Sequence, residues 1–248
     1  MKNYILGAHM RRMISSPALY FGIAVQALGL VLLCHGEAHA ISEAIEYMAA
    51  PVYYLDLLFF LALPPLAYAM TGTDDKNTRM LYFWSIRGGA DNYAVSYYIT
   101  SLCSGFLMTF CGLGLGCLIS AFLGCSLNVY TDGQRELAVL ADVSPLLYYV
   151  ARIGELAMGS MTVAGIASAA AVFFRNKVTV LTMPIILLLM LGSFFSADHM
   201  LFSKTKLILG ATYAPGQLGL HLLLHLWMSV VWWIACGMIT VHHIRRSV

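Results

Sequence analysis

Long apolar stretches fill this chain almost from end to end, with short polar loops between them. Each stretch is close to or above the roughly 18–20 apolar residues that a helix needs to cross a bilayer. A surface helix of a soluble protein would carry polar residues along one face, and these stretches do not. The sequence therefore predicts an all-α membrane protein with six transmembrane helices, at residues 18–34, 52–71, 94–124, 145–174, 178–197 and 221–241.

The composition agrees with this interpretation. Charged residues make up 10% of the chain and hydrophobic residues 60%, whereas soluble domains carry about 25% charged residues. Six spans and their loops use all 248 residues, so we expect one transmembrane domain over residues 1–248.

The basic residues are distributed unequally between the two sets of loops. The termini and the loops after even-numbered spans hold ten of them: Lys2, Arg11, Arg12, Lys76, Arg79, Arg87, Arg175, Lys177, Arg245 and Arg246. The other side holds only Arg135, Lys204 and Lys206. Because cytoplasmic loops of membrane proteins are enriched in Lys and Arg, we expect a multi-pass protein of a bacterial-type plasma membrane with both termini inside.

Two segments outside the spans are patterned as helices. Residues 2–16 place apolar side chains at helical spacing beside Lys2, Arg11 and Arg12, which predicts an interfacial helix that contacts anionic membrane lipid. In the loop 72–93, Thr73 or Asp74 can cap a helix that ends near the two glycines at 88–89. We expect this second helix, at residues 73–89, on the cytoplasmic side.

Three charged residues fall inside the predicted spans: Asp56, Arg152 and Glu155. Each costs about 2.5–3.5 kcal/mol at the centre of a membrane helix, so such residues usually have a function. Arg152 and Glu155 are three positions apart and share a helix face. Two interpretations stay open: a polar lining of a transport path, or a buried network that holds spans together.

Small residues recur along two spans. Gly112, Gly114 and Gly116 lie in the third span, and Ser160 and Ala164 begin a four-residue repeat in the fourth. Such stripes allow helix backbones to approach closely, so we expect helix packing there.

The histidines raise the question of a metal site. His35, His39 and Glu43 are spaced by four residues, as are His221 and His225. A metal site needs three or four converging ligands, and the sequence offers only pairs and a carboxylate. We therefore predict no metal ligands. A disulfide between Cys34 and Cys125, both expected at the outer surface, stays open.

Signatures of common enzymes are absent from the sequence. No Gly is followed by Lys, so the chain has no phosphate-binding loop of the Walker A type. No GxSxG motif is present either. The sequence therefore predicts no enzyme activity in this chain by itself and no nucleic-acid partner.

The order of these parts resembles the type-two permeases of ABC exporters over essentially the whole chain. Four features are the basis of the resemblance. Two lie in the first half of the chain: a basic N-terminal segment, 4–17, that ends in Pro17, and the loop 74–87. The other two are the tight hairpin 175–177 and Pro215, which precedes a last span that ends in Arg245 and Arg246. The loop departs from the family pattern at Ser85-Ile86-Arg87, where a Pro-containing turn is common, and near Ser96, where a Lys is often found.

The resemblance implies a membrane subunit of an ATP-driven exporter that forms the path for an amphipathic substrate such as a peptide, lipid or drug. Two such subunits, either two copies of this chain or this chain and a related one, would form the complex, and each would bind a separate ABC ATPase subunit. The ATPase subunits would bind ATP and Mg, and this chain would bind no cofactor. The helix at 73–89 would be the coupling helix, and its ATPase contacts would be Arg79, Phe83, Trp84 and Arg87. The translocation path would be lined by Tyr53, Tyr54, Asp56 and Glu155.

Two other functions fit the same residues. One is a membrane-embedded metal-dependent enzyme that uses His35, His39 and Glu43, or Glu155. The other is a membrane immunity or scaffold protein that binds a partner without transport.

Overall fold

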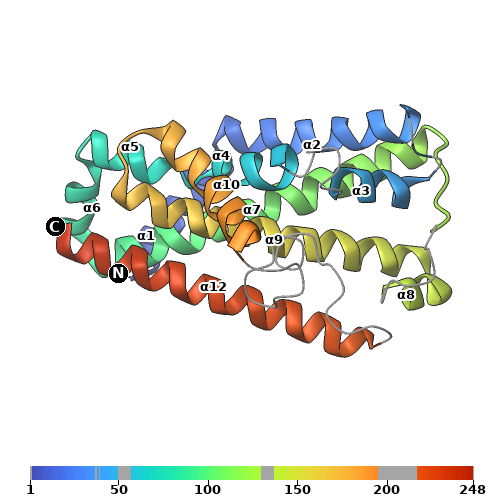
Figure 1. Cartoon of the computed structure of the whole chain (residues 1–248). Coiled ribbons are helices and arrows are strands. Elements are labelled where there is room, and N and C mark those ends of the chain that lie inside the picture. Colours follow the sequence, from blue (N-terminus) through green and yellow to red (C-terminus); the bar gives the residue numbers. More distant parts are fainter. Residues whose placement is uncertain are drawn as a thin grey trace.

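The computed structural model describes residues 2–36, 38, 40–49, 57–129, 137–194 and 217–247. This described part consists of helices and contains no β-strand; Ala40 and Ser126 form an isolated bridge. The long helices lie lengthwise beside one another in an elongated bundle (Figure 1). The predicted all-α class is confirmed.

Four of the described helices are long and apolar enough to cross a membrane: α2 (Pro17–Gly36), α7 (Ala90–Phe122), α9 (Pro145–Phe173) and α12 (Leu218–Ser247). They coincide with four of the six predicted spans, and they identify a membrane protein by length and composition. At 1.5 Å per residue, the 33 residues of α7 reach about 50 Å, which exceeds the roughly 30 Å hydrocarbon core.

The other two predicted spans are shorter or interrupted. The span predicted at 178–197 corresponds to α10 (Lys177–Phe194), which contains Pro184. The span predicted at 52–71 begins outside the described residues. From residue 57 it is not one α-helix, because a π-helix at Leu57–Ala62 precedes the short α4 at Leu63–Ala67, which holds Pro64 and Pro65. Proline has no N–H to donate, so a regular hydrogen-bond ladder cannot pass through this point.

The centre of the bundle is formed by α7 and α9, which pack against each other; α2 packs on α7, and α12 packs on both. Glycines make the close approaches possible. A Cβ added at Gly105 would lie 2.7 Å from the backbone oxygen of Ser160. Further along the same side of α7, a Cβ at Gly112 or Gly116 would meet α2 at Gln26 or Leu30, whereas Gly114 faces open space. The expected small-residue packing is therefore present for Gly112 and Gly116 but not for Gly114.

The helix predicted at residues 2–16 is present as α1 (Lys2–Ile14), which packs on α7. Its apolar stripe has a different environment from the expected one. Ile5, His9 and Met13 are buried inside the protein, and Ile14 is half exposed. Most of the stripe thus contacts other helices of the bundle rather than lipid.

The helix predicted at 73–89 is two helices, α5 (Thr71–Asn77) and α6 (Met80–Gly88). The helical path breaks at Thr78 and Arg79 because Arg79 has the left-handed φ of 59°. Two further short helices complete the described part, α3 (Ile41–Ala49) and α8 (Ala138–Val143). The start of α1, the end of α12 and α6 all lie at one end of the bundle, and α8 lies at the other (Figure 1).

Candidate functional sites

Arg152 of α9 stands at the centre of a group of ionisable side chains within the bundle. Its Nε and Nη2 donate to the two carboxylate oxygens of Glu46 on α3, at 3.0 and 3.1 Å. Its Nη1 donates to Glu155 Oε2, at 3.0 Å. A guanidinium presents its N–H groups in a planar fork that matches a carboxylate, so one Arg side chain joins the short helix α3 to α9.

Glu155 extends this group to α12. Its second oxygen, Oε1, lies 2.6 Å from Nε2 of His221, and both residues are buried. His225, one turn further along α12, is also buried and lies close enough to interact with the charge of Glu155. We call Glu46, Arg152, Glu155 and His221 the ionic cluster.

The ionic cluster joins three elements, α3, α9 and α12, inside the apolar bundle. Isolated charges in such a place would cost several kcal/mol each, and hydrogen-bonded partners of opposite charge offset much of that cost. The described contacts support the structural interpretation of Arg152 and Glu155 directly, because both residues bind side chains of other helices. They also place a guanidinium and an imidazole within hydrogen-bonding distance of the Glu155 carboxylate, and groups of these kinds inside a membrane can bind a polar group or a proton.

The other residues predicted for the translocation path, Tyr53, Tyr54 and Asp56, lie outside the described residues. Glu46 was not among the residues predicted from the sequence, and His221 was not predicted as a partner of Glu155. A signal for both existed. Glu46 lies on an amphipathic segment beside apolar residues, and His221 begins an apolar helix, so each carries a polar group next to a buried face.

A second polar network crosses the middle of the bundle at Gln26 of α2. Its Nε2 donates to the carbonyl of Phe59 in the π-helix, at 2.8 Å, and to Thr109 Oγ1 of α7, at 3.2 Å. Thr109 in turn donates to Ser160 of α9, at 2.7 Å. Four elements are thereby tied together by buried hydrogen bonds, and a backbone carbonyl of the π-helix receives a partner.

A third group of polar contacts fixes α5 to its neighbours, and we call it the α5 clamp. Asp75, which is fully buried, accepts from Arg12 of α1 at 2.6 Å and from the Tyr93 hydroxyl of α7 at 2.8 Å. Lys76 donates to the carbonyl of Val172 at the end of α9, at 2.8 Å. An ammonium at this position also complements the partial negative charge of a helix C-terminus.

The α5 clamp continues at the hairpin between α9 and α10. Asn77 donates to the carbonyl of Arg175 at 3.2 Å, and Lys177 pairs with Asp74 at 2.7 Å. The short helix α5 is thus bound by side-chain contacts to α1, α7, α9 and the start of α10. Any displacement of α5 must move the ends of these helices or break the contacts.

Helix α6, which follows α5, turns part of its surface to solvent. Phe83, Arg87 and Arg79, three of the predicted ATPase contacts, are exposed, and the guanidinium of Arg87 lies 4.4 Å from the centre of the Phe83 ring. Ile86 is 83% exposed and was not among the predicted contacts. Trp84 differs from the prediction, because it is partly buried and its ring packs against His9 of α1.

Charge and burial shift three pKa values around the α5 clamp. Burial lowers the pKa of His9 to about 4, although Asp75 acts in the opposite direction. Burial would also lower the pKa of Arg12, but the hydrogen bond and charge of Asp75 raise it overall. Burial and the charge of Arg175 lower the pKa of Lys76. His9 is therefore neutral at physiological pH, in contact with the hydroxyl of Tyr68 at 2.5 Å.

Within the part of the chain that the structure describes, no three His, Cys, Asp or Glu side chains converge as metal ligands. His39 of the predicted triplet lies outside that part. His35 Nε2 lies 3.8 Å from the sulfur of Cys125. Cys34 and Cys125 are both free thiols, so the disulfide that the sequence left open is not formed here.

Comparisons with protein-family models, with curated proteins and with solved structures found no match to this chain.

Proposed function

We propose that this chain is the membrane subunit of an ATP-driven exporter and that a separate ATPase subunit docks on α6. In this proposal both termini, α5 and α6 lie in the cytoplasm, the chain crosses the membrane six times, and two such subunits form the complex. The basic residues concentrated in the termini and the α5–α6 region support that orientation. The absence of a phosphate-binding loop in the sequence supports a motor on another chain.

The observation that carries the proposal is the contrast between α5 and α6. Helix α5 is held on several sides by Asp75, Lys76 and Asn77, whereas α6 presents Phe83 and Ile86 to solvent. Aromatic and Arg side chains are enriched in protein interfaces, where they supply much of the binding energy. A coupling element requires a docking surface attached to a firmly held helix. Here α6 offers the surface, and α5 is the helix that contacts four others.

The contacts define how a force on α6 would reach the bundle. A partner that moves α6 moves α5 with it, because only Thr78 and Arg79 separate them. Asp75 would transmit this motion to α1 and α7, and Lys76 would transmit it to the end of α9. The same helix α9 carries Arg152 and Glu155, so its motion would reach the ionic cluster.

In this proposal the ionic cluster is the polar part of the translocation path. Glu155 is buried in the structure, so access to it would require α3 or α12 to separate from α9. The polar group of an amphipathic substrate would then replace the contact that Arg152 or His221 makes with Glu155.

The first test is isolation of the complex. The tagged chain is expressed in its native host, extracted from membranes in mild detergent and analysed for a stoichiometric subunit with nucleotide-binding motifs and ATP hydrolysis. Co-purification of such an ATPase supports the proposal. A chain that purifies without any ATPase, or with a peptide partner in its place, supports a scaffold or immunity function and contradicts ours.

The second test uses α6. We expect Ile86→Glu to abolish co-purification of the ATPase while the variant still reaches the membrane, because a charge replaces an exposed apolar contact. Val139→Glu is the matched control, since Val139 is 56% exposed on α8 at the opposite end of the bundle (Figure 1). Equal ATPase recovery with both variants would show that α6 is not the docking surface.

A further inference from the structure

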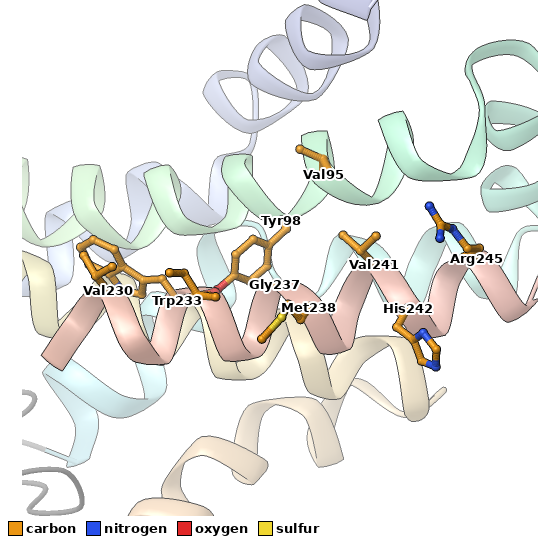
Figure 2. A pocket seen from close by; sticks show the side chains of 10 residues that line it. Val95, Tyr98, Val230, Trp233, Gly237, Met238, Val241, His242 and Arg245 are labelled. Atoms are coloured by element: carbon orange, nitrogen blue, oxygen red, sulfur yellow. The ribbon is translucent and has the colours of Figure 1, made fainter. Parts of the chain in front are cut away.

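A groove of about 680 Å³ runs between α7 and α12 on the outside of the bundle. It is lined from α7 by Val95 and Tyr98 and from α12 by residues between Val230 and Arg245. Figure 2 shows Trp233 and Tyr98 toward one end of the groove and His242 and Arg245 toward the other. This surface takes no part in the proposed translocation path or in the α5 clamp.

The wall of the groove is apolar although it includes a Tyr and a Trp. The hydroxyl of Tyr98 donates to the carbonyl of Trp233, at 2.6 Å, and the indole Nε1 of Trp233 donates to Thr162, at 3.0 Å. Both polar groups therefore have partners within the protein, and the rings contribute apolar surface. Gly237 completes the wall, because a Cβ there would lie 2.9 Å from the Tyr98 ring.

The end of the groove near the C-terminus carries basic side chains. Arg245 is exposed, and its Nε and Nη2 donate to the carboxylate of Asp91, at 2.9 and 2.6 Å. Within the described residues, Nη1 of Arg245 makes no hydrogen bond, so its N–H groups are available to a second acceptor. His242 lines the same end, and Arg246 is the next residue along α12.

The dimensions of the groove suit an acyl chain. From Val230 to Arg245 α12 rises about 22 Å, at 1.5 Å per residue. A hydrocarbon chain, whose carbons contact neighbours at about 4 Å, is thin enough to lie along a groove of this length and of about 680 Å³.

We propose that this groove binds one anionic phospholipid, with an acyl chain between α7 and α12 and the phosphate at Arg245 and His242. Both helices are long and apolar enough to cross the membrane, so the groove opens toward lipid. Arginine binds phosphate oxygens with charge-assisted hydrogen bonds, and basic pockets between membrane helices hold anionic headgroups. Asp91 binds Nε and Nη2 of Arg245, which leaves Nη1 for the phosphate.

Native mass spectrometry of the purified protein tests this proposal. The protein is reconstituted in nanodiscs that contain equal amounts of phosphatidylglycerol and phosphatidylethanolamine, then released into detergent. We expect one phosphatidylglycerol to be retained at least tenfold more often than phosphatidylethanolamine. Equal retention of the two lipids overturns the assignment of the headgroup, and retention of neither overturns the site.

Two pairs of variants locate the site. Val95→Trp fills the groove from α7 and should abolish retention, whereas Leu115→Trp, on the same helix and outside the groove, should not; the two residues are 43% and 44% exposed. Arg245→Gln should reduce retention at least tenfold and remove the preference for phosphatidylglycerol. Asp91→Asn, which keeps Arg245 and removes its competing carboxylate, should preserve retention or increase it.

A cysteine introduced in the groove checks the rival occupant. Ile234 lines the groove and is exposed, so the variant Ile234→Cys should be labelled at this position by a lipid-soluble maleimide in the membrane. Efficient disulfide crosslinking of two copies of this variant through the introduced thiol would show that a second protomer fills the groove. That result would overturn the lipid proposal.

Discussion

Arg152 and Glu46 are 106 residues apart in the sequence, yet two hydrogen bonds of 3.0 and 3.1 Å join their side chains inside the bundle. The pair attaches the short helix α3 to α9. Since Arg152 also binds Glu155, which contacts His221, this one guanidinium supports the contact between three elements. The consequence is that Arg152 affects stability far more than an ordinary surface Arg.

Replacement of Arg152 by Met should therefore lower the free energy of unfolding by about 3 kcal/mol or more, because the buried Glu155 and the partly buried Glu46 lose their hydrogen bonds to the guanidinium. The measurement is thermal unfolding of the detergent-solubilised protein. Arg245→Met is the control, since its ion pair with Asp91 is exposed and such pairs contribute little. A similar drop in melting temperature for both variants would contradict the role given to Arg152.

Stability should fall in mild acid because of His9. Its pKa is about 4 in the folded protein and about 6.5 when unfolded, so the unfolded state binds more protons between these values. The contribution of His9 is complete above pH 6.5 and decreases as the pH falls toward 4. At about 1.4 kcal/mol per pH unit, the loss over this window is about 3 kcal/mol.

The measurement for His9 is the melting temperature between pH 7 and pH 4. His9→Gln keeps a group that can accept from the Tyr68 hydroxyl but does not titrate, so its curve should be flatter than that of the wild type. His242→Gln, at an exposed site, should keep the wild-type dependence. An unchanged slope in His9→Gln would exclude His9 as the source.

Two glycines of α7 should respond in opposite ways to Ala. Gly105→Ala places a Cβ 2.7 Å from the Ser160 backbone oxygen, so α7 and α9 must separate, at a cost of about 1–3 kcal/mol. Gly114→Ala meets no atom within 4 Å and should stabilise the helix by about 0.5–1 kcal/mol. If Gly105→Ala is as stable as Gly114→Ala, the described approach of the two helices is wrong.

The turn between α5 and α6 should tolerate Gly better than Arg. Arg79 has a φ of 59°, a conformation that costs an L-residue roughly 1–2 kcal/mol. Gly avoids that cost but loses more backbone entropy on folding, so Arg79→Gly should gain up to about 1 kcal/mol. Arg79→Ala keeps the unfavourable φ and serves as the control. Chemical denaturation of both variants distinguishes them, and equal stability would rule out strain at this position.

The candidate site was only partly predictable. Glu155 and Arg152 could be found because charges inside apolar stretches are expensive and rare. Their partners could not, since Glu46 lies outside the predicted spans and His221 pairs with a residue 66 positions away. Similarly, apolar spacing predicted a helix at residues 2–16, but not that other helices of the bundle would cover Ile5 and Met13 in place of lipid.

By itself, the sequence determined that this is a membrane protein and that its fold is all-α. Stretches such as 94–124 and 145–174 are too apolar for water, and in lipid a backbone must satisfy its own hydrogen bonds, which leaves helices. Only the tertiary structure decided which helices meet. In that structure Glu46 accepts hydrogen bonds from Arg152, and Gln26 donates to the Phe59 carbonyl. Asp75 of α5 accepts from Arg12 of α1. These contacts join distant parts of the chain, and their geometry depends on how side chains of several helices pack together, which local periodicity does not encode.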